Sequence, residues 1–217
     1  MNRNRFAVLA PGFEHLSYPL DRHDAAEGAS FAERSEQFRF SRAQSEPHAQ
    51  MALVSAEGLS EHTSEPVGYV CAQEGEIFVV CRSSGRKGKE IARDERKAFS
   101  TAIVKRLAAL HTDGFGCGGL SPEAVEFAGK EAKLLNPSKI FALHEGETTF
   151  YEAVSTLRAL VSSGMSSEAD LPRLASAYLS HSPVCRHEIV QHLQKKGKSA
   201  APRDALVQSA MKIIPFF

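Results

Sequence analysis

The residues of this chain that could do chemistry gather in one stretch, 110–125, which reads LHTDGFGCGGLSPEAV. It holds an imidazole at His111, a thiol at Cys117 and carboxylates at Asp113 and Glu123. A thiol beside an imidazole can become a thiolate nucleophile, and a carboxylate can act as a general base or bind a hard cation. Four glycines in the same stretch favour a loop. The stretch is therefore the first candidate for a functional loop.

A second set of possible ligands lies near the carboxyl end, at Cys185, His187 and His192. On a helix with about 3.6 residues per turn, side chains five positions apart point about 140° from each other. Two histidines that bind one zinc ion from a single helix stand four positions apart. The spacing therefore favours a surface helix over a metal site.

A long helix is expected to position the loop. Phe99, Ile103, Leu107 and Leu110 recur at helical spacing and end at His111. Further helices are predicted from a capping box at 149–152, from a second capping signal at 167–170, over 183–196 and over 202–214. The apolar tail, 213–217, either packs back onto this helical part or contacts a partner.

The loop resembles the catalytic loop of kinase-like phosphotransferases such as lipopolysaccharide and aminoglycoside kinases. In that family a helix ends in Leu-His, and a His-Gly-Asp-Leu-x-Pro-x-Asn-Ile run follows a short turn. Leu120 and Pro122 match this framework. Cys117 stands where the family has His, Gly119 where it has the base Asp, and Ala124 where it has the metal-binding Asn. The resemblance implies a catalytic loop without its catalytic side chains.

Two further family positions are also replaced. The resemblance places Asn136 where the family has the metal-binding Asp of Asp-Phe-Gly. The segment 45–59 is similar to the small-lobe helix, and Gln50 takes the place of its Glu.

The strand that carries the family's ATP-binding lysine is best placed at 36–42, yet no Lys occurs before Lys87. Arg39 or Arg42 could take the place of this lysine, although a planar guanidinium does not replace a compact ammonium without rearrangement. Phosphoryl transfer depends on positioning and on charge neutralisation by a lysine, metal ions and an Asp base.

These replacements imply a pseudokinase that binds or regulates and needs no cofactor, with another protein as its expected partner. The alternative is a divergent phosphotransferase or nucleotidyltransferase whose acids have moved, with Asp113 or Glu123 first. Such an enzyme would need Mg²⁺ and ATP, and a regulatory protein would not.

The predicted fold is α+β, a two-lobe kinase-like fold with a small antiparallel sheet and a mainly helical second part. A first strand near the amino terminus and a hairpin at 66–72 and 76–81 supply the sheet. The expected divisions are an N-lobe at 1–81, a hinge and basic linker at 82–97, and a helical C-lobe at 98–217.

Charge is unevenly distributed along the chain. Residues 1–80 hold six Arg, no Lys and twelve Asp plus Glu, for a net charge of −6, and the whole chain is neutral. The segment 82–97 holds seven cations and three anions, so an anionic ligand is possible at Arg86, Lys87 and Lys89. A solvated surface is the competing interpretation, and nucleic acid is disfavoured because no aromatic residues are interleaved for base stacking.

Composition predicts a cytoplasmic globular protein. No run approaches the roughly 20 apolar residues of a membrane span. The four cysteines lack metal or disulfide spacing, which favours reduced thiols, most of them near a core.

Overall fold

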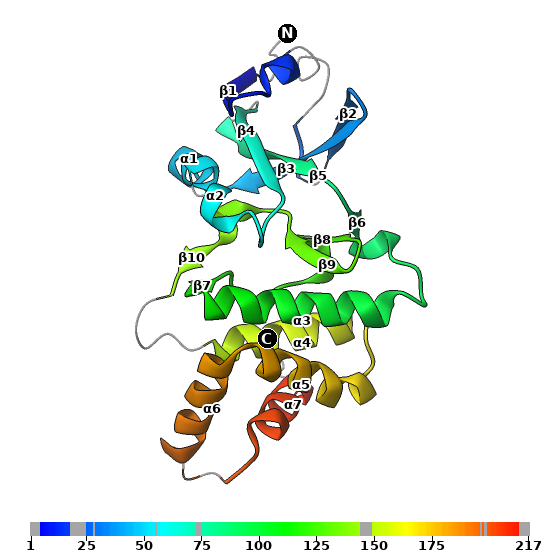
Figure 1. The fold of residues 1–217 in the computed structure, drawn as a ribbon, viewed down its shortest axis with the longest axis vertical. Coiled ribbons are helices and arrows are strands. Elements are labelled where there is room, and N and C mark those ends of the chain that lie inside the picture. The colour runs from blue at the N-terminus through cyan, green and yellow to red at the C-terminus, as the bar shows by residue number, and fades with distance from the viewer. Residues whose placement is uncertain are drawn as a thin grey trace. The chain divides into compact units, whose positions relative to one another are not determined.

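The computed structural model describes residues 5–17, 25–27, 29–54, 56–72, 75–143, 149–195, 197 and 199–212. The chain forms two compact units, the first made of residues 1–85 and 133–139 and the second of residues 86–132 and 140–217 (Figure 1). The chain passes from the first unit to the second between Gly85 and Arg86, within the segment 82–97 that was predicted as the hinge. The return of residues 133–139 to the first unit had no signal in the sequence.

A five-stranded antiparallel sheet in the order β1-β4-β5-β3-β2 builds the first unit. The sequence predicted the first strand, the strand at 36–42 and the hairpin, and all three are confirmed. The strands are β1 (Arg5–Leu9), β2 (Ser30–Glu33), β3 (Glu36–Ala43), β4 (Glu65–Cys71) and β5 (Ile77–Ser83).

The two faces of the sheet carry different cores, because successive side chains of a strand point to opposite faces. Phe38 and Phe40 of β3 join a cluster of large apolar side chains that includes Leu16 and Phe31. The opposite face packs against the helix α1 (Glu46–Val54). That second cluster consists of Ala43, Ala49, Ala52, Tyr69, Val79 and Cys81.

The helix predicted over 45–59 is divided into α1 and the short α2 (Ala56–Leu59). The backbone amide of His48 donates to Ser45 Oγ at 3.5 Å, so Ser45 acts as the predicted, though weak, cap. After α2, the chain pairs with the returning segment: Leu134 N donates to His62 O at 2.8 Å and Ser64 N donates to Leu134 O at 2.9 Å.

The second unit is mainly helical, as predicted. Its α-helices are α3 (Arg96–Thr112), α4 (Phe150–Ser162), α5 (Leu171–His181), α6 (Pro183–Lys195) and α7 (Pro202–Met211). The side chains of Phe99, Ile103, Leu107 and Leu110 on α3 are fully buried. The tail, 213–217, lies outside the described residues.

Short elements connect these helices. A small sheet has the order β6-β8-β9, formed by β6 (Arg86–Lys87), β8 (Val125–Ala128) and β9 (Glu131–Leu134). A second pairs β7 (Phe115–Gly116) with β10 (Phe141–Ala142). The later parts of the chain also contain the 3₁₀ turns η4 (Gly88–Glu90), η5 (Pro122–Ala124), η6 (Pro137–Lys139) and η7 (Glu168–Asp170).

The architecture confirms the predicted α+β class, with an antiparallel amino-terminal sheet and a helical carboxyl-terminal part. All four cysteines are free thiols, and Cys81, Cys117 and Cys185 are buried. Within the described ranges, every helix is too short or too polar to cross a membrane.

The contact between η4 and η5 leads to a stability prediction. A Cβ added to Gly88 would lie 2.8 Å from both Cβ and the carbonyl oxygen of Pro122. Gly88→Ala should therefore lower the free energy of unfolding by about 1–3 kcal/mol, measured by urea denaturation. Gly58→Ala in α2 is the control, because no atom lies within 4 Å of the position that its Cβ would take. An equal loss in both variants would contradict the tight contact at Pro122.

Candidate functional site

The candidate loop follows α3 directly and runs from Gly116 to Val125. β7 fixes its first residue by pairing with β10, and η5 ends it at the start of β8. Between these anchors, Gly118 and Gly119 adopt positive φ angles of 73° and 94°. Glycine adopts this left-handed region readily, whereas other residues are strained there. The backbone of the loop therefore requires glycine at both positions.

Gly119, where the resemblance placed the family's base, has little space for a larger side chain. A Cβ on Gly119 would lie 3.0 Å from Ser155 Cβ, 3.1 Å from Ser155 Oγ and 3.2 Å from the carbonyl oxygen of Glu152. An Asp here would meet α4 in addition to the backbone strain. The loop is thus packed against α4, and both its backbone angle and this close packing favour glycine at position 119.

Ala124 and Asn136, where the resemblance placed the family's metal ligands, offer no free ligand atom. Ala124 ends η5 and has only a methyl side chain. Asn136, which lies in the first unit, is buried. Its Nδ2 donates to Arg42 O at 2.7 Å, and its Oδ1 accepts hydrogen bonds from the backbone amide and the hydroxyl of Ser138. The Asn136 amide therefore has a structural role in holding its own unit together.

Gln50 lies exposed on α1 and takes part in a local network. Its Nε2 donates to Tyr69 Oη at 3.4 Å, and Tyr69 Oη donates to Glu46 Oε1 at 2.7 Å. The hydrogen bond to Glu46 raises the pKa of Tyr69 above its ordinary value. The acid of this helix that has a hydrogen-bond partner is Glu46, one turn before the predicted position.

The strand β3 carries two arginines in different settings. Arg42 is exposed, forms an ion pair with Glu76 and lies over the ring of Phe78 at 5.8 Å. Arg39 is only 6% exposed. Its Nη2 donates to Gly85 O at 3.2 Å, whereas Nε and Nη1 have no hydrogen-bond partner among the described residues. Of the two substitutes for the missing lysine, Arg39 is the one with buried, unused donors.

The residue that organises the loop is Glu152, on the first turn of α4. Its carboxylate accepts a hydrogen bond from Cys117 N at 3.0 Å and another from Gly118 N at 2.9 Å. The sequence assigned this residue to a capping box with Thr149, and that prediction is wrong, because Thr149 makes no side-chain cap. Both side chains are used in tertiary contacts instead.

His111 connects Glu152 to a buried polar cluster. Its Nε2 lies 3.0 Å from Glu152 Oε2, and its Nδ1 lies 2.6 Å from Tyr178 Oη. Since a carboxylate can only accept, Nε2 carries a proton. The sulfur of Cys185 lies 3.6 Å from Nδ1, so α6 also reaches the imidazole.

Thr149 extends this cluster towards the surface of the unit. Its hydroxyl lies 2.7 Å from Cys185 Sγ and donates to Glu188 Oε2 at 3.0 Å. The buried polar groups of α3, α4, α5 and α6 are therefore joined by hydrogen bonds. Such a network ties the loop to the helical core.

Burial and hydrogen bonding act in opposite directions on these groups. Burial alone would raise the pKa of Glu152, but hydrogen bonds from His111 and from the amides of Cys117 and Gly118 hold it below its ordinary value. Burial would likewise lower the pKa of His111, but Cys185 and Glu152 raise it above its ordinary value. Both shifts favour the charged pair.

The thiol of Cys117 is not a nucleophile in this setting. Burial, and then the negative charge of Glu152, raises its pKa to about 12. Its sulfur lies 3.7 Å from Glu152 Oε2, and the thiol beside His111 belongs to Cys185 instead. A thiolate pair of His111 with Cys117, which the sequence already disfavoured, is thus not supported by the structure.

The second thiol, Cys185, lies on the buried face of α6, whose opposite face is exposed as expected of a surface helix. Burial would raise its pKa, but hydrogen bonds with His111 and Thr149 help to lower it below the ordinary value. His187 is exposed on the same helix. In the described part of the chain, no three His, Cys, Asp or Glu side chains are grouped to hold a metal ion.

The remaining acids and bases of the predicted site are dispersed. Asp113 caps the end of α3 and Glu123 is exposed on η5. In the hinge, Arg86 is paired with Glu95 through two hydrogen bonds of 2.6 and 2.8 Å. Lys89 is exposed and Lys87 is half-buried.

Replacing Glu152 should destabilise the second unit in a pH-dependent manner. Glu152→Ala leaves two loop amides and an imidazole N–H without an acceptor, so we expect a loss of about 3–5 kcal/mol in unfolding free energy. Glu152→Gln, which keeps the shape, should lose less. The exposed pair provides the control Glu95→Gln, whose effect should be much smaller.

The pH dependence follows from the two pKa shifts. The lowered pKa of Glu152 stabilises the fold above its unfolded value of 4.5, and this stabilisation is lost as pH falls through the folded pKa. The raised pKa of His111 stabilises below 6.5 and is lost as pH rises through the folded pKa. The difference between wild type and Glu152→Gln should thus be largest between pH 4.5 and 6.5. A difference that does not change with pH would contradict the charged pair.

Comparison with known proteins identifies the fold. No protein-family model and no curated protein matches the sequence. Among solved structures, 592 chains match, so the architecture is widespread and does not by itself fix an activity. One of them is the crystal structure of an aminoglycoside-3'-phosphotransferase of type VIII, with a TM-score of 0.52 and 12% identity, covering 87% of this chain and 90% of that one. The chain therefore has the kinase-like fold of an aminoglycoside phosphotransferase.

Proposed function

We propose that this chain is a pseudokinase, a protein of kinase-like fold that has lost phosphotransfer and acts by binding or regulating another protein. The observation that carries the proposal is the backbone at Gly119. Its φ of 94° and the 3.0 Å approach of Ser155 make a larger side chain at this position both strained and crowded. The loop packs closely against α4 at Gly119, and this packing accommodates glycine better than an Asp base.

The other positions agree with this proposal. Phosphoryl transfer is mostly positioning and charge neutralisation, so it requires metal ligands and an anchored phosphate together. Ala124 has no ligand atom, and the amide of Asn136 is occupied by Arg42 and Ser138. Replacement of all these groups at once supports a non-catalytic role.

A protein partner is supported by exposed aromatic side chains beside the loop. Phe141 is 44% exposed and Tyr151 is 64% exposed. The Phe141 ring packs over Gly116, and Tyr151 precedes Glu152 on α4. Large exposed aromatic residues are typical of protein interfaces. Four free thiols support a reducing, cytoplasmic setting for such an interaction.

The second candidate function is a divergent phosphotransferase or nucleotidyltransferase, and Arg39 is the observation that favours it. Two buried guanidinium nitrogens without partners would be satisfied by an anionic group. The aminoglycoside phosphotransferase with the same fold gives this candidate its reaction class. The acids of such an enzyme would be Asp113 or Glu123.

Calorimetry with ATP and Mg²⁺ separates the two candidates. We expect no Mg²⁺-dependent binding to the unmodified chain and no phosphotransfer. Gly119→Asp should restore neither, because groups of one catalytic unit are strongly non-additive. It should instead lower stability by about 1–3 kcal/mol. Micromolar, Mg²⁺-dependent binding would overturn the pseudokinase proposal in favour of the enzyme.

The basic hinge gives a separate prediction about anionic partners. Replacing Arg86, Lys87 and Lys89 by Ala should preserve the fold and weaken binding to a polyanion such as heparin. Because the attraction is one of charge alone, binding should fade between about 50 and 200 mM salt. Glu95→Gln should strengthen it by releasing Arg86 from its ion pair. Binding that is insensitive to salt would point to a shaped pocket instead.

A further inference from the structure

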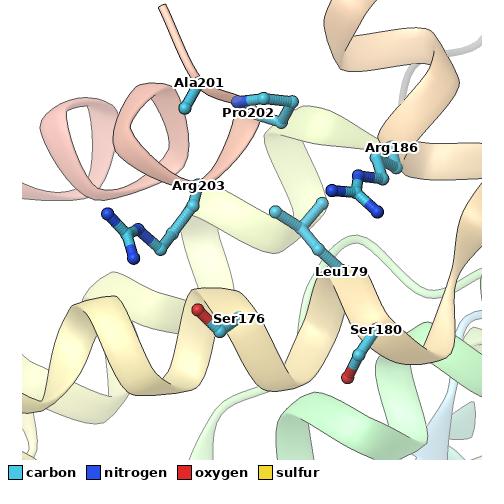
Figure 2. A pocket seen from close by; sticks show the side chains of 7 residues that line it. All are labelled: Ser176, Leu179, Ser180, Arg186, Ala201, Pro202 and Arg203. Carbon is cyan, nitrogen blue, oxygen red and sulfur yellow. The ribbon is translucent and has the colours of Figure 1, made fainter.

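A pocket lies among three helices of the second unit, away from the candidate loop. It is lined by residues of α5, α6 and the start of α7, and its volume is about 430 Å³ (Figure 2). Small-molecule sites commonly have volumes of about 300–1,000 Å³. The pocket is thus large enough for a small metabolite.

Two arginines stand on either side of Leu179 in this pocket. Figure 2 shows the Arg186 guanidinium, from α6, turned towards Leu179 of α5. Arg186 is exposed, and its guanidinium has no hydrogen bond or ion pair with any residue that the structure describes. Arginine donors form a planar fork that matches a phosphate or a carboxylate. Arg186 is therefore available to an anion.

Arg203 lies on the other side of Leu179 and is turned to its neighbour. Its Nε and Nη2 each lie 3.0 Å from Asp204 Oδ1. Both side chains are about half exposed, at 52% and 48%. An exposed pair of this kind is weak and can be exchanged for a better acceptor.

Other polar groups of the pocket are donors as well. Ser176 presents a hydroxyl group from α5, whereas the Ser180 hydroxyl already donates to the backbone carbonyl of Ala177. The first turn of α7 has no side-chain cap, because Ala201 precedes it. The N–H groups of Arg203 and Asp204 in this turn have no helical acceptor. They add to the two arginines, which are the main anion-binding groups.

The sequence around the pocket is positively charged, like the two arginines. Residues 183–212 contain six Lys plus Arg and two Asp plus Glu, for a net charge of +4, whereas residues 1–80 have a net charge of −6. A basic surface raises the local concentration of anions. The pocket therefore lies in a part of the chain that attracts negative ligands.

We propose that this pocket binds a small phosphate monoester with an apolar body. Arg186 and Arg203 bind the phosphate oxygens, and Leu179 and Pro202 contact the apolar part. A phosphate monoester is favoured over a carboxylate, because near neutral pH it carries close to two negative charges for the two guanidinium groups. The proposal is independent of catalysis at the loop.

The test is a calorimetric titration of the full chain with phenyl phosphate, inorganic phosphate and benzoate. We expect phenyl phosphate to bind most tightly and benzoate, which has the ring but a single charge, most weakly. Arg186→Met and Arg203→Met should each weaken phenyl phosphate binding by about tenfold or more. Lys195→Met removes the same charge from an exposed position of α6 outside the pocket and should leave binding unchanged.

Asp204→Asn is predicted to increase affinity, and misfolding cannot produce such an increase. It removes a negative charge beside the phosphate and frees Arg203, so binding should become tighter. Absence of phenyl phosphate binding at millimolar concentration would overturn the proposal. So would equal binding of benzoate, or an equal loss of affinity in Lys195→Met. Binding that survives in Gly119→Asp would place the ligand away from the loop, whatever the outcome of the ATP experiment.

Discussion

The second unit depends on the hydrogen bonds that the Glu152 carboxylate accepts. Two amides of the glycine loop and one imidazole nitrogen point at the same side chain. The donors of Cys117 and His111 are buried and would otherwise lack an acceptor, and a buried donor left unpaired costs about 1–3 kcal/mol. The loop, α3 and α4 therefore hold their positions together, and the rest of the polar cluster extends from this centre through Tyr178 and Cys185.

This arrangement explains how a glycine-rich loop remains ordered. The left-handed backbone at Gly118 and Gly119 turns the amides of the loop towards α4. Pro122 gives a second anchor, because η4 packs against it through Gly88. Leu120 N also donates to Thr156 Oγ1 at 2.8 Å. The framework thus stands on amide contacts and glycine packing, which need neither a metal ion nor a base.

The described arginines divide into structural and available groups. Arg82 is bound by Glu36 and Glu65, and Arg86 by Glu95. Arg39 and Arg186 differ from these, since the first has unused buried donors and the second has an unpartnered exposed guanidinium. An anion at either site would satisfy donors that the chain itself does not. Binding in this protein is therefore best sought at guanidinium groups, not at thiols or acids.

The sequence alone determined the order of the elements and which side chains the loop carries. Helical spacing from Phe99 to Leu110 predicted α3, and the alternating residues at 36–42 predicted β3, because these patterns depend only on one element's own periodicity. The absence of a lysine before Lys87, and of polar side chains at Gly119 and Ala124, is equally a property of the sequence. These features fixed the fold class before any contact was known.

Only the tertiary structure decided which side chains meet. Glu152 fits a local capping box as well as it fits a loop-binding residue, and the contact that decides between them spans 35 positions. The burial of Cys185 beside His111 spans 74 positions. A sequence pattern reports neighbours along one helix or strand, whereas these contacts depend on how α4 and α6 pack against α3. For that reason the loop could be located from the sequence, but the carboxylate that holds it could not.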